Sequence, residues 1–120
     1  MNKQTLIFSG IIVLAVVLAL FFFKTPSSNK YGNLDKFAQC LADKKITMYG
    51  AYWCSHCKAQ KALFGDSWKY VPYVECTENE KECLAKEIEG YPTWIFLDGK
   101  KLSGEQSLET LSVESGCLLQ

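Results

Sequence analysis

One uncharged stretch constrains this chain more than any other feature of its 120 residues. Residues 6–23 read LIFSGIIVLAVVLALFFF and contain no charged side chain. As an α-helix this run would extend about 27 Å, close to the roughly 30 Å thickness of a bilayer's hydrocarbon core. We therefore expect a transmembrane helix over residues 6–23, within an N-terminal membrane anchor formed by residues 1–24.

A cleaved signal peptide is the competing interpretation of this run. The run is longer than the usual apolar region of a signal peptide, and no Ala-x-Ala-like cleavage site follows Phe23. A buried core helix fits least, because so small a domain could not surround it on all sides. The sequence favours an uncleaved anchor, followed by a polar tether at residues 25–32.

The remaining residues, 33–120, are enough for one small domain. A domain of that size builds a modest core, to which cross-links would add, and the chain has six cysteines. Lysines flank the apolar run on both sides, so positive charge does not fix its orientation. Disulfides persist on the oxidising side of a membrane, so we expect a single-pass membrane protein whose soluble domain is extracytoplasmic, in the periplasm or its equivalent.

The charge balance excludes one class of partner. The 13 basic side chains are all lysine and are offset by 13 acidic ones, which gives a formal net charge of zero. Binding to a phosphate backbone draws on a basic face, and no basic run exists here. We expect no nucleic acid as a partner.

Hydrophobic periodicity and turn residues predict an α/β domain with the element order α-β-α-β-α-β-β-α. Caps and breakers set the expected bounds. These elements are a helix capped by Asn33, a strand at 46–53, a helix at 54–64 stopped by Gly65, a strand at 71–76, a helix opened by a Thr77–Glu80 capping box and stopped by Gly90, a hairpin of 93–97 and 100–102, and a helix at 107–115.

The motif Trp53-Cys54-Ser55-His56-Cys57 lies where the first strand meets the second helix. Thiol–disulfide exchange needs an accessible thiolate and a second thiol that resolves the mixed disulfide. The free N–H groups and dipole of a helix start favour the thiolate form of Cys54, and the spacing of three returns Cys57 to the same helix face. We expect Cys57 to be the more buried of the two.

His56 is the only histidine in the chain. An imidazolium between the two cysteines would favour the Cys54 thiolate, stabilise the reduced protein and make its disulfide more oxidising. A zinc knuckle and a structural disulfide are the alternatives. Zinc sites usually draw on a second closely spaced pair, whereas Cys76 and Cys83 stand seven positions apart. We expect no metal and no cofactor.

The segment Trp53 to Lys58, with Tyr91-Pro92-Thr93 after it, resembles the thioredoxin superfamily. Over residues 33–119 the closer likeness is to the thioredoxin-like domain found with bacterial and plastid homologues of vitamin K epoxide reductase. The resemblance implies a thioredoxin-like fold, a central mixed sheet flanked by helices. The segments that carry the closer likeness are MYGAYWC (48–54), KALFG (61–65), VEC (74–76) and GYPTW (90–94).

The resemblance also implies roles for individual residues. Pro92 would be cis and would face the Cys54–Cys57 disulfide, where the backbone of its neighbour pairs with an extended substrate segment. We assign Tyr91 and Trp53 to substrate binding, with plain packing as the alternative for Trp53. The implied redox partner is an integral-membrane, quinone-linked protein of the vitamin K epoxide reductase type, which would take electrons from Cys54 and Cys57.

One position departs from the family pattern. Many thioredoxins carry a buried acid six residues before the first motif cysteine, and this chain has Met48 there. The proton of Cys57 then needs another acceptor, either Glu75 at the end of the neighbouring strand or water. A solvated carboxylate with no catalytic role is the alternative for Glu75.

The other four cysteines suggest two cross-links. A Cys76–Cys83 bond would close a loop of about eight residues and contribute roughly 2.5 kcal/mol by loop entropy; an electron relay to the motif is the alternative role. A bond between Cys40 and Cys117 would close about 78 residues and contribute about 4.5 kcal/mol. Free thiols or pairing with another chain remain the alternatives for that second pair.

These features favour an enzyme that acts on extracytoplasmic protein thiols as a disulfide donor or isomerase. A tethered thiol reductase is the first alternative, because the same fold serves both directions. The second is a non-enzymatic module, either a metal carrier that uses Cys54, His56 and Cys57 or a docking domain.

Overall fold

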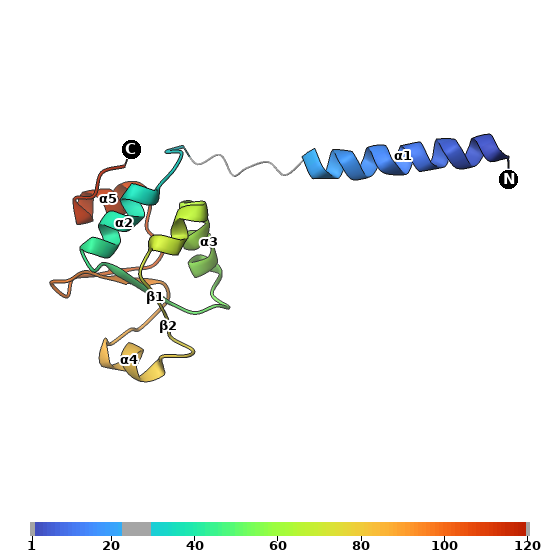
Figure 1. The fold of residues 1–120 in the computed structure, drawn as a ribbon. Helices are drawn as coiled ribbons and strands as arrows, with labels where there is room; N and C mark the ends of the chain where they lie inside the picture. Colours follow the sequence, from blue (N-terminus) through green and yellow to red (C-terminus); the bar gives the residue numbers. More distant parts are fainter. Residues whose placement is uncertain (1, 23–29, 120) are drawn as a thin grey trace.

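A computed structural model describes residues 2–22 and 30–119 of the chain. Helix α1 (Lys3–Phe22) contains nearly all of the apolar run, and its side chains are exposed as far as residue 19. Figure 1 shows α1 apart from the remaining elements. The transmembrane helix expected over 6–23 is not found, since no helix among the described residues is both long and apolar enough to cross a membrane. Phe23 and most of the expected tether lie outside the described residues.

A four-stranded mixed sheet forms the centre of residues 30–119, in the order β2-β1-β3-β4. Strand β1 pairs in parallel with β2 and antiparallel with β3, and β3 pairs antiparallel with β4. This is the mixed sheet that the sequence predicts. The strands are β1 (Thr47–Gly50), β2 (Tyr73–Glu75), β3 (Thr93–Ile95) and β4 (Lys101–Ser103).

Helices cover both faces of this sheet. Figure 1 shows α2, α3 and α5 on one face and α4 on the other. A short 3-10 helix, η1, follows α3 directly and is an element that the sequence did not predict. The helices are α2 (Asp35–Asp43), α3 (Ser55–Phe64), η1 (Gly65–Tyr70), α4 (Glu80–Ala85) and α5 (Leu108–Ser115).

Strand alternation divides the core into two clusters. Successive strand residues point to opposite faces, so Met48 and Trp94 join the larger cluster beneath α2, α3 and α5. Their neighbours Tyr49 and Ile95 join a smaller cluster with Cys83 of α4 and Cys76, which directly follows β2. The larger cluster contains both motif cysteines, Cys54 and Cys57. The motif is therefore anchored in the main core.

Three predicted boundaries are displaced by three residues or more in the structure. The strand expected over 46–53 ends at Gly50, because the chain turns and the Cys54 N–H bonds the Ala51 carbonyl at 3.1 Å. Helix α4 begins at Glu80 and not at Thr77, because the Thr77 hydroxyl donates to Glu75 at 2.7 Å and forms no capping box. That helix also ends at Ala85, well before Gly90.

The predicted cap of the first domain helix is displaced by one residue. The N-cap position of α2 is Leu34, which has no side-chain oxygen. Asn33 instead accepts the backbone N–H of Asp35, the first helical residue, at 2.7 Å. Asn33 therefore satisfies a free N–H at the helix start from one position further out.

Candidate functional site

The loop between β1 and α3 places both motif cysteines at one helix start. Cys54 is the N-cap residue of α3, and its sulfur accepts the backbone N–H of Cys57 at 3.4 Å. Both are free thiols in this structure. The Cys54 sulfur therefore lies at the positive end of the helix.

The two thiols differ in burial. Cys57 is fully enclosed at 0% exposure, whereas Cys54 is 7% exposed. The order agrees with the sequence prediction. Cys54 is nevertheless less open than expected of a reacting thiol, because the loop before β3 lies against it.

That loop contains the cis peptide bond between Tyr91 and Pro92. The Cys54 thiol donates to the Tyr91 carbonyl across 3.7 Å. The next carbonyl, that of Pro92, is taken by the backbone N–H of Gly104 at the end of β4. The fold thus turns one carbonyl of this loop toward the reactive sulfur and uses the other to hold the loop on the sheet.

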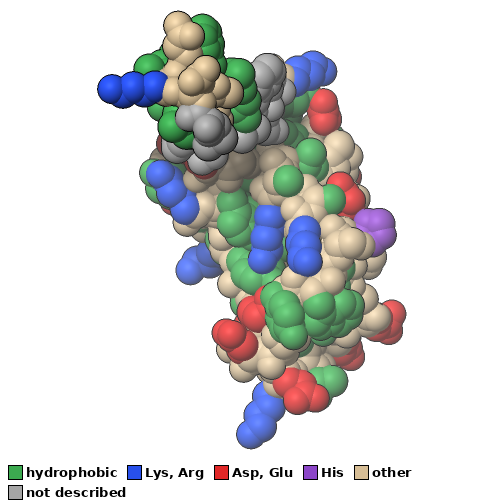
Figure 2. Space-filling model, turned by 90° about the vertical axis from the view of Figure 1, so that its right-hand side faces the viewer, with side chains coloured by type: hydrophobic (Ala, Val, Ile, Leu, Met, Phe, Trp, Pro, Cys, Tyr) green, Lys and Arg blue, Asp and Glu red, His purple; other side chains and the backbone are tan. Residues whose placement is uncertain are grey.

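Aromatic side chains lie beside the motif. The rings of Trp53 and Tyr91 contact each other edge to face, with centroids 5.9 Å apart. Trp53 is 58% exposed and Tyr52 is 67% exposed. Figure 2 shows hydrophobic side chains on the same face as the single histidine, drawn in purple. This part of the surface offers apolar area next to Cys54.

His56 projects into solvent from the first turn of α3. Its Nδ1 lies 3.3 Å from a carboxylate oxygen of Glu105, in the loop between β4 and α5. Glu105 has no sequence pattern that marks it, because its pairing with His56 depends on how that loop folds back on α3. The predicted effect of His56 on the Cys54 thiolate stays a prediction.

The surroundings of Cys57 hold its proton tightly. Burial raises the pKa of Cys57 to about 11, and the neighbouring Cys54 adds to the effect, while a backbone hydrogen bond with Ala51 and the charge of Lys61 oppose it. The Lys61 ammonium lies 3.7 Å from the centre of the Tyr73 ring. An acceptor for the Cys57 proton is therefore needed near this sulfur if the thiolate is to form.

Gly50 allows the close approach between β1 and Cys57. A Cβ atom at Gly50 would lie 2.8 Å from Cys57 Sγ and 3.3 Å from the Tyr73 hydroxyl oxygen. Any side chain there would displace the thiol or the phenol. The last residue of β1 is thus bordered by both the Cys57 thiol and the Tyr73 ring.

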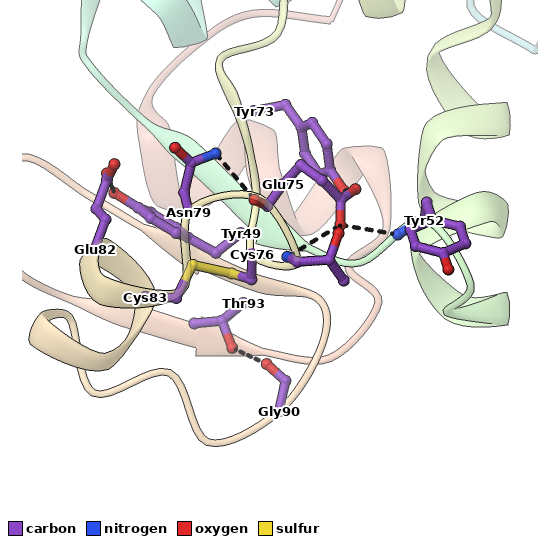
Figure 3. The surroundings of a disulfide bond; sticks show 11 residues. Tyr49, Tyr52, Tyr73, Glu75, Cys76, Asn79, Glu82, Cys83, Gly90 and Thr93 are labelled. Atoms are coloured by element: carbon purple, nitrogen blue, oxygen red, sulfur yellow. Dashed lines mark hydrogen bonds between the residues drawn. A yellow bond between two sulfur atoms is a disulfide. The ribbon is translucent and has the colours of Figure 1, made fainter.

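Tyr73 and Glu75 form a hydrogen-bonded pair on β2. The Tyr73 hydroxyl donates to Glu75 Oε2 at 2.6 Å. The other oxygen, Oε1, accepts from the Thr77 hydroxyl and from the Tyr52 backbone N–H, at 2.7 and 3.1 Å (Figure 3). Every partner of this carboxylate is a donor, so it is held as an anion.

The same contacts shift both ionisation equilibria. Burial raises the pKa of Tyr73, and its bond to Glu75 raises it further. Burial alone would raise the pKa of Glu75 as well, but hydrogen bonds from Tyr73, Thr77 and Tyr52 outweigh burial and lower it. Tyr73 therefore stays protonated and Glu75 stays ionised.

Sequence reasoning named Glu75 and missed Tyr73, Gly50 and Lys61. A signal for Tyr73 did exist: residues two apart on a strand share a face, so residues 73 and 75 had to lie on one side of β2. That this side faces Cys57 follows from the parallel pairing of β1 with β2, which periodicity alone does not specify.

Gln60 is a further residue that the sequence did not mark. It is fully buried on α3, and its oxygen accepts from Trp94 Nε1 at 3.2 Å and from the Gln106 backbone N–H at 2.6 Å. Its amide nitrogen donates to the Gln106 carbonyl at 2.9 Å. This amide fixes the motif helix to β3 and to the loop before α5.

The remaining four cysteines form two disulfides. Cys40 of α2 is bonded to Cys117 after α5, with Cα atoms 5.9 Å apart. Cys76, directly after β2, is bonded to Cys83 of α4 (Figure 3). The second bond lies in the smaller core cluster, on the sheet face opposite the cluster that holds the motif thiols.

Within residues 2–22 and 30–119, no three His, Cys, Asp or Glu side chains are grouped so that they could hold a metal ion.

The chain is similar to several known proteins. A family model described as Thioredoxin matches residues 30–113. Among curated proteins, "Thiol-disulfide oxidoreductase LTO1" of Arabidopsis thaliana is 47% identical over 78 residues, which are 58% of this chain and 20% of that protein. "Thioredoxin domain-containing protein 5 homolog" of Drosophila melanogaster is 34% identical over 90 residues, or 64% of this chain and 22% of that protein.

A third relative, "Protein disulfide-isomerase 5-1" of Arabidopsis thaliana, is 34% identical over 71 residues, which are 49% of each chain. The matched region thus spans between a fifth and a half of the length of these relatives.

Proposed function

The chain belongs to the thioredoxin family, and from this premise we propose that it is a protein thiol–disulfide oxidoreductase whose reacting atoms are the sulfurs of Cys54 and Cys57. One observation carries the proposal. The chain keeps two free thiols three positions apart at a helix start, one beside a carbonyl and one enclosed, while its other four cysteines are bonded to each other. Two of the relatives are named as a thiol–disulfide oxidoreductase and a protein disulfide-isomerase, and these names support the same activity.

The exchange proceeds in two displacements on the oxidised protein. A substrate thiolate attacks Cys54 Sγ, the Cys54–Cys57 bond breaks, and Cys57 leaves with the electron pair and takes up a proton. A second substrate thiolate then attacks the substrate sulfur of the mixed disulfide, and Cys54 leaves as a thiolate at the start of α3. The substrate gains one disulfide, and the protein gains two electrons.

Substrate binding in this proposal uses the loop that covers Cys54. An extended peptide that pairs with the backbone at Tyr91 would bring its sulfur to the carbonyl that the Cys54 thiol now contacts. The exposed rings of Tyr52 and Trp53 would pack on apolar side chains of an unfolded chain. Such contacts favour protein thiols over small thiols as substrates.

Disulfide donation is the direction that we propose for the exchange. Its support is His56, whose imidazolium would stabilise the reduced form by favouring the Cys54 thiolate. The test is a redox titration of the Cys54–Cys57 pair against glutathione. A reduction potential well above the roughly −270 mV of thioredoxin supports the donor role, and a value at or below it assigns the chain to the reductases.

We also propose that the domain acts on the extracytoplasmic side of a membrane, attached through its N-terminal apolar segment. The support comes from the sequence: residues 6–23 carry no charge, and the two disulfides suit an oxidising compartment. Extraction of membranes at alkaline pH tests the attachment, and protease accessibility in intact and opened cells tests the side. Release of the full chain by alkali would contradict the attachment.

The proposed reoxidant is a quinone-linked integral-membrane protein of the vitamin K epoxide reductase type. It would accept the two electrons held by Cys54 and Cys57 through a mixed disulfide with Cys54. The resemblance over residues 33–119 is the support for this partner. Recovery of that partner on Cys54 of a Cys57→Ser chain is the expected result, and its absence when soluble substrates are recovered would exclude it.

The activity itself is tested with matched serine variants of the two thiols. The full chain should oxidise a reduced, unfolded protein in a glutathione buffer. Cys57→Ser should accumulate a mixed disulfide on Cys54, because no thiol remains to resolve it, whereas Cys54→Ser should neither turn over nor form the adduct. Turnover that survives Cys54→Ser would overturn the proposal.

A further inference from the structure

Cys57 needs a proton acceptor if it is to resolve a mixed disulfide on Cys54. Burial raises the pKa of Cys57 to about 11, so at neutral pH the thiol holds its proton and must lose it before it can attack Cys54. Met48 of β1 is buried in the same core cluster as Cys57, but its side chain has no group that can accept a proton. The proton must therefore reach a group on another element.

Strand β2 places a candidate acceptor beside the end of β1. In the parallel pair, Met48 lies opposite Tyr73 and Gly50 lies opposite Glu75. Tyr73 packs against the core cluster that contains Cys57. Because Gly50 has no side chain, Cys57 Sγ and the Tyr73 hydroxyl oxygen both lie within 3.3 Å of the point where its Cβ would stand. Both groups therefore border the end of β1, and the charge of Cys57 acts on Tyr73.

Glu75 orients the hydroxyl group of Tyr73. The hydroxyl hydrogen points to Glu75 Oε2, 2.6 Å away, so a lone pair of the same oxygen is left for another donor. Glu75 is itself fixed by the Thr77 hydroxyl and the Tyr52 backbone N–H. Glu75 is half-buried, so its carboxylate is also within reach of solvent.

The other titratable groups around Cys57 do not serve as proton acceptors. Cys54 is engaged in the mixed disulfide at the step in question. Lys61 is a cation whose charge favours the thiolate but which has no lone pair to accept the proton. Among the described residues that influence Cys57, this leaves Tyr73, with Glu75 behind it.

On these contacts, and resting on the proposed exchange activity, we propose that Tyr73 transfers the proton of Cys57 and that Glu75 positions Tyr73 and passes the proton to water. When the mixed disulfide is resolved, the Cys57 S–H proton moves to Tyr73 Oη as the Tyr73 proton moves to Glu75 Oε2. Cys57 Sγ bonds to Cys54 Sγ, and the substrate sulfur leaves with the electron pair. Glu75 then releases the proton to water. In disulfide donation the same path runs backward and protonates the departing Cys57.

The chain contains its own matched control. Tyr49 on β1 also donates to a glutamate, Glu82 Oε1, at 3.1 Å, and burial likewise raises its pKa. Its ring belongs to the smaller cluster on the other face of the sheet. Tyr49→Phe therefore removes an equivalent hydroxyl and hydrogen bond without touching the route to Cys57.

Dithiobis(nitrobenzoate) separates the two thiol steps in the full chain, with both disulfides left intact. The first thionitrobenzoate is released when Cys54 attacks the reagent, and the second when Cys57 resolves the adduct on Cys54. Stopped-flow absorbance should show an unchanged first phase in Tyr73→Phe and a second phase slowed about a hundredfold at neutral pH. The slowed phase should accelerate about tenfold per pH unit, because hydroxide must then remove the Cys57 proton. Glu75→Gln should slow the same phase to a smaller extent.

Two results would overturn the inference. One is a second phase in Tyr73→Phe with the rate and pH profile of the parent chain. The other is an equal slowing in Tyr49→Phe, which would show a general effect of lost tyrosine hydroxyls. If Tyr73→Phe does not fold, Glu75→Gln decides by the same readout. Absence of a Cys54-dependent first phase in the parent chain would instead contradict the proposed function.

Discussion

The sulfur of Cys54 lies 3.7 Å from the carbonyl oxygen of Tyr91, so the loop before β3 covers the thiol at the start of α3. The ring of Tyr91 in turn contacts the exposed ring of Trp53. One short loop therefore limits access to the reactive sulfur and joins it to the apolar surface beside it. In the proposed exchange, the same contacts would therefore serve both substrate recognition and protection of the thiol.

Trp53→Ala should weaken the binding of protein substrates and leave the reduction potential of the Cys54–Cys57 pair unchanged. Removing the ring deletes exposed apolar area next to Cys54, so we expect KM for a reduced, unfolded protein to rise about tenfold, or about 1.4 kcal/mol. The reduction potential should stay at the parent value. Leu97→Ala, which removes an exposed apolar side chain on the β3–β4 turn, is the control. An equal loss toward glutathione and toward the protein substrate would contradict a role in substrate binding.

His56→Ala should make the motif disulfide less oxidising. If the imidazolium favours the Cys54 thiolate by about tenfold, its loss lowers the reduction potential by on the order of 30 mV. Titration against glutathione measures the change. His56→Lys keeps a cation at the same position and should retain most of the parent potential. An unchanged potential in His56→Ala would show that the pairing with Glu105 cancels the effect of the ring.

Local sequence patterns predicted the helices and strands of this domain better than they predicted which residues lie together in space. The hairpin pattern after residue 93 and the cysteine pair at a strand–helix junction are local signals, and the structure contains both the β3–β4 hairpin and the β1–α3 junction. The placement of Cys57 near Tyr73 is not a local signal. It needs the parallel register of β1 and β2 and the missing side chain at Gly50, which are set by packing across residues far apart in the chain.

The misplaced boundary of α4 has a related cause. Thr77 fits a capping box with Glu80 on sequence alone, because Ser or Thr followed three residues later by Glu is the usual signature. In the folded chain the Thr77 hydroxyl is drawn to Glu75, which also holds Tyr73. A tertiary hydrogen-bond network at the candidate site thus overrides a local helix signal.

The two disulfides should stabilise the domain unequally. Cys40 and Cys117 are 77 positions apart, whereas Cys76 and Cys83 are 7 apart. Loop entropy then gives about 4.5 kcal/mol for the first bond and about 2.5 kcal/mol for the second. Urea unfolding of the two paired Cys→Ala variants measures both losses. A larger loss from the short loop would show that packing around Cys76 and Cys83, and not loop closure, governs their contribution.

Gly50→Ala should damage both stability and resolution. The new Cβ would lie 2.8 Å from Cys57 Sγ and 3.1 Å from a ring carbon of Tyr73, so one of the two must move. We expect a loss of about 1–3 kcal/mol in the free energy of unfolding and a slower second phase with dithiobis(nitrobenzoate). Gly90→Ala is the control, because nothing lies within 4 Å of its added Cβ. A fully stable Gly50→Ala chain with parent kinetics would contradict the close approach.

The burial of Cys57 predicts a pH dependence of stability with a defined sign. Its pKa rises from an ordinary 9.0 to about 11 on folding, because burial disfavours the thiolate. The folded chain therefore holds this proton more tightly than the unfolded chain. The stabilisation is fully present below pH 9.0 and is lost as the pH rises through about 11.

Urea unfolding of Cys54→Ser, in which no motif disulfide can form, measures this contribution against the double variant Cys54→Ser/Cys57→Ala. Lysine and tyrosine titrations are common to both chains and cancel in the difference between their free energies of unfolding. That difference should be constant up to about pH 9.0 and should then shift against Cys54→Ser as the pH approaches 11. A difference that stays flat or shifts in the opposite direction would show that Cys57 is not enclosed in the reduced protein.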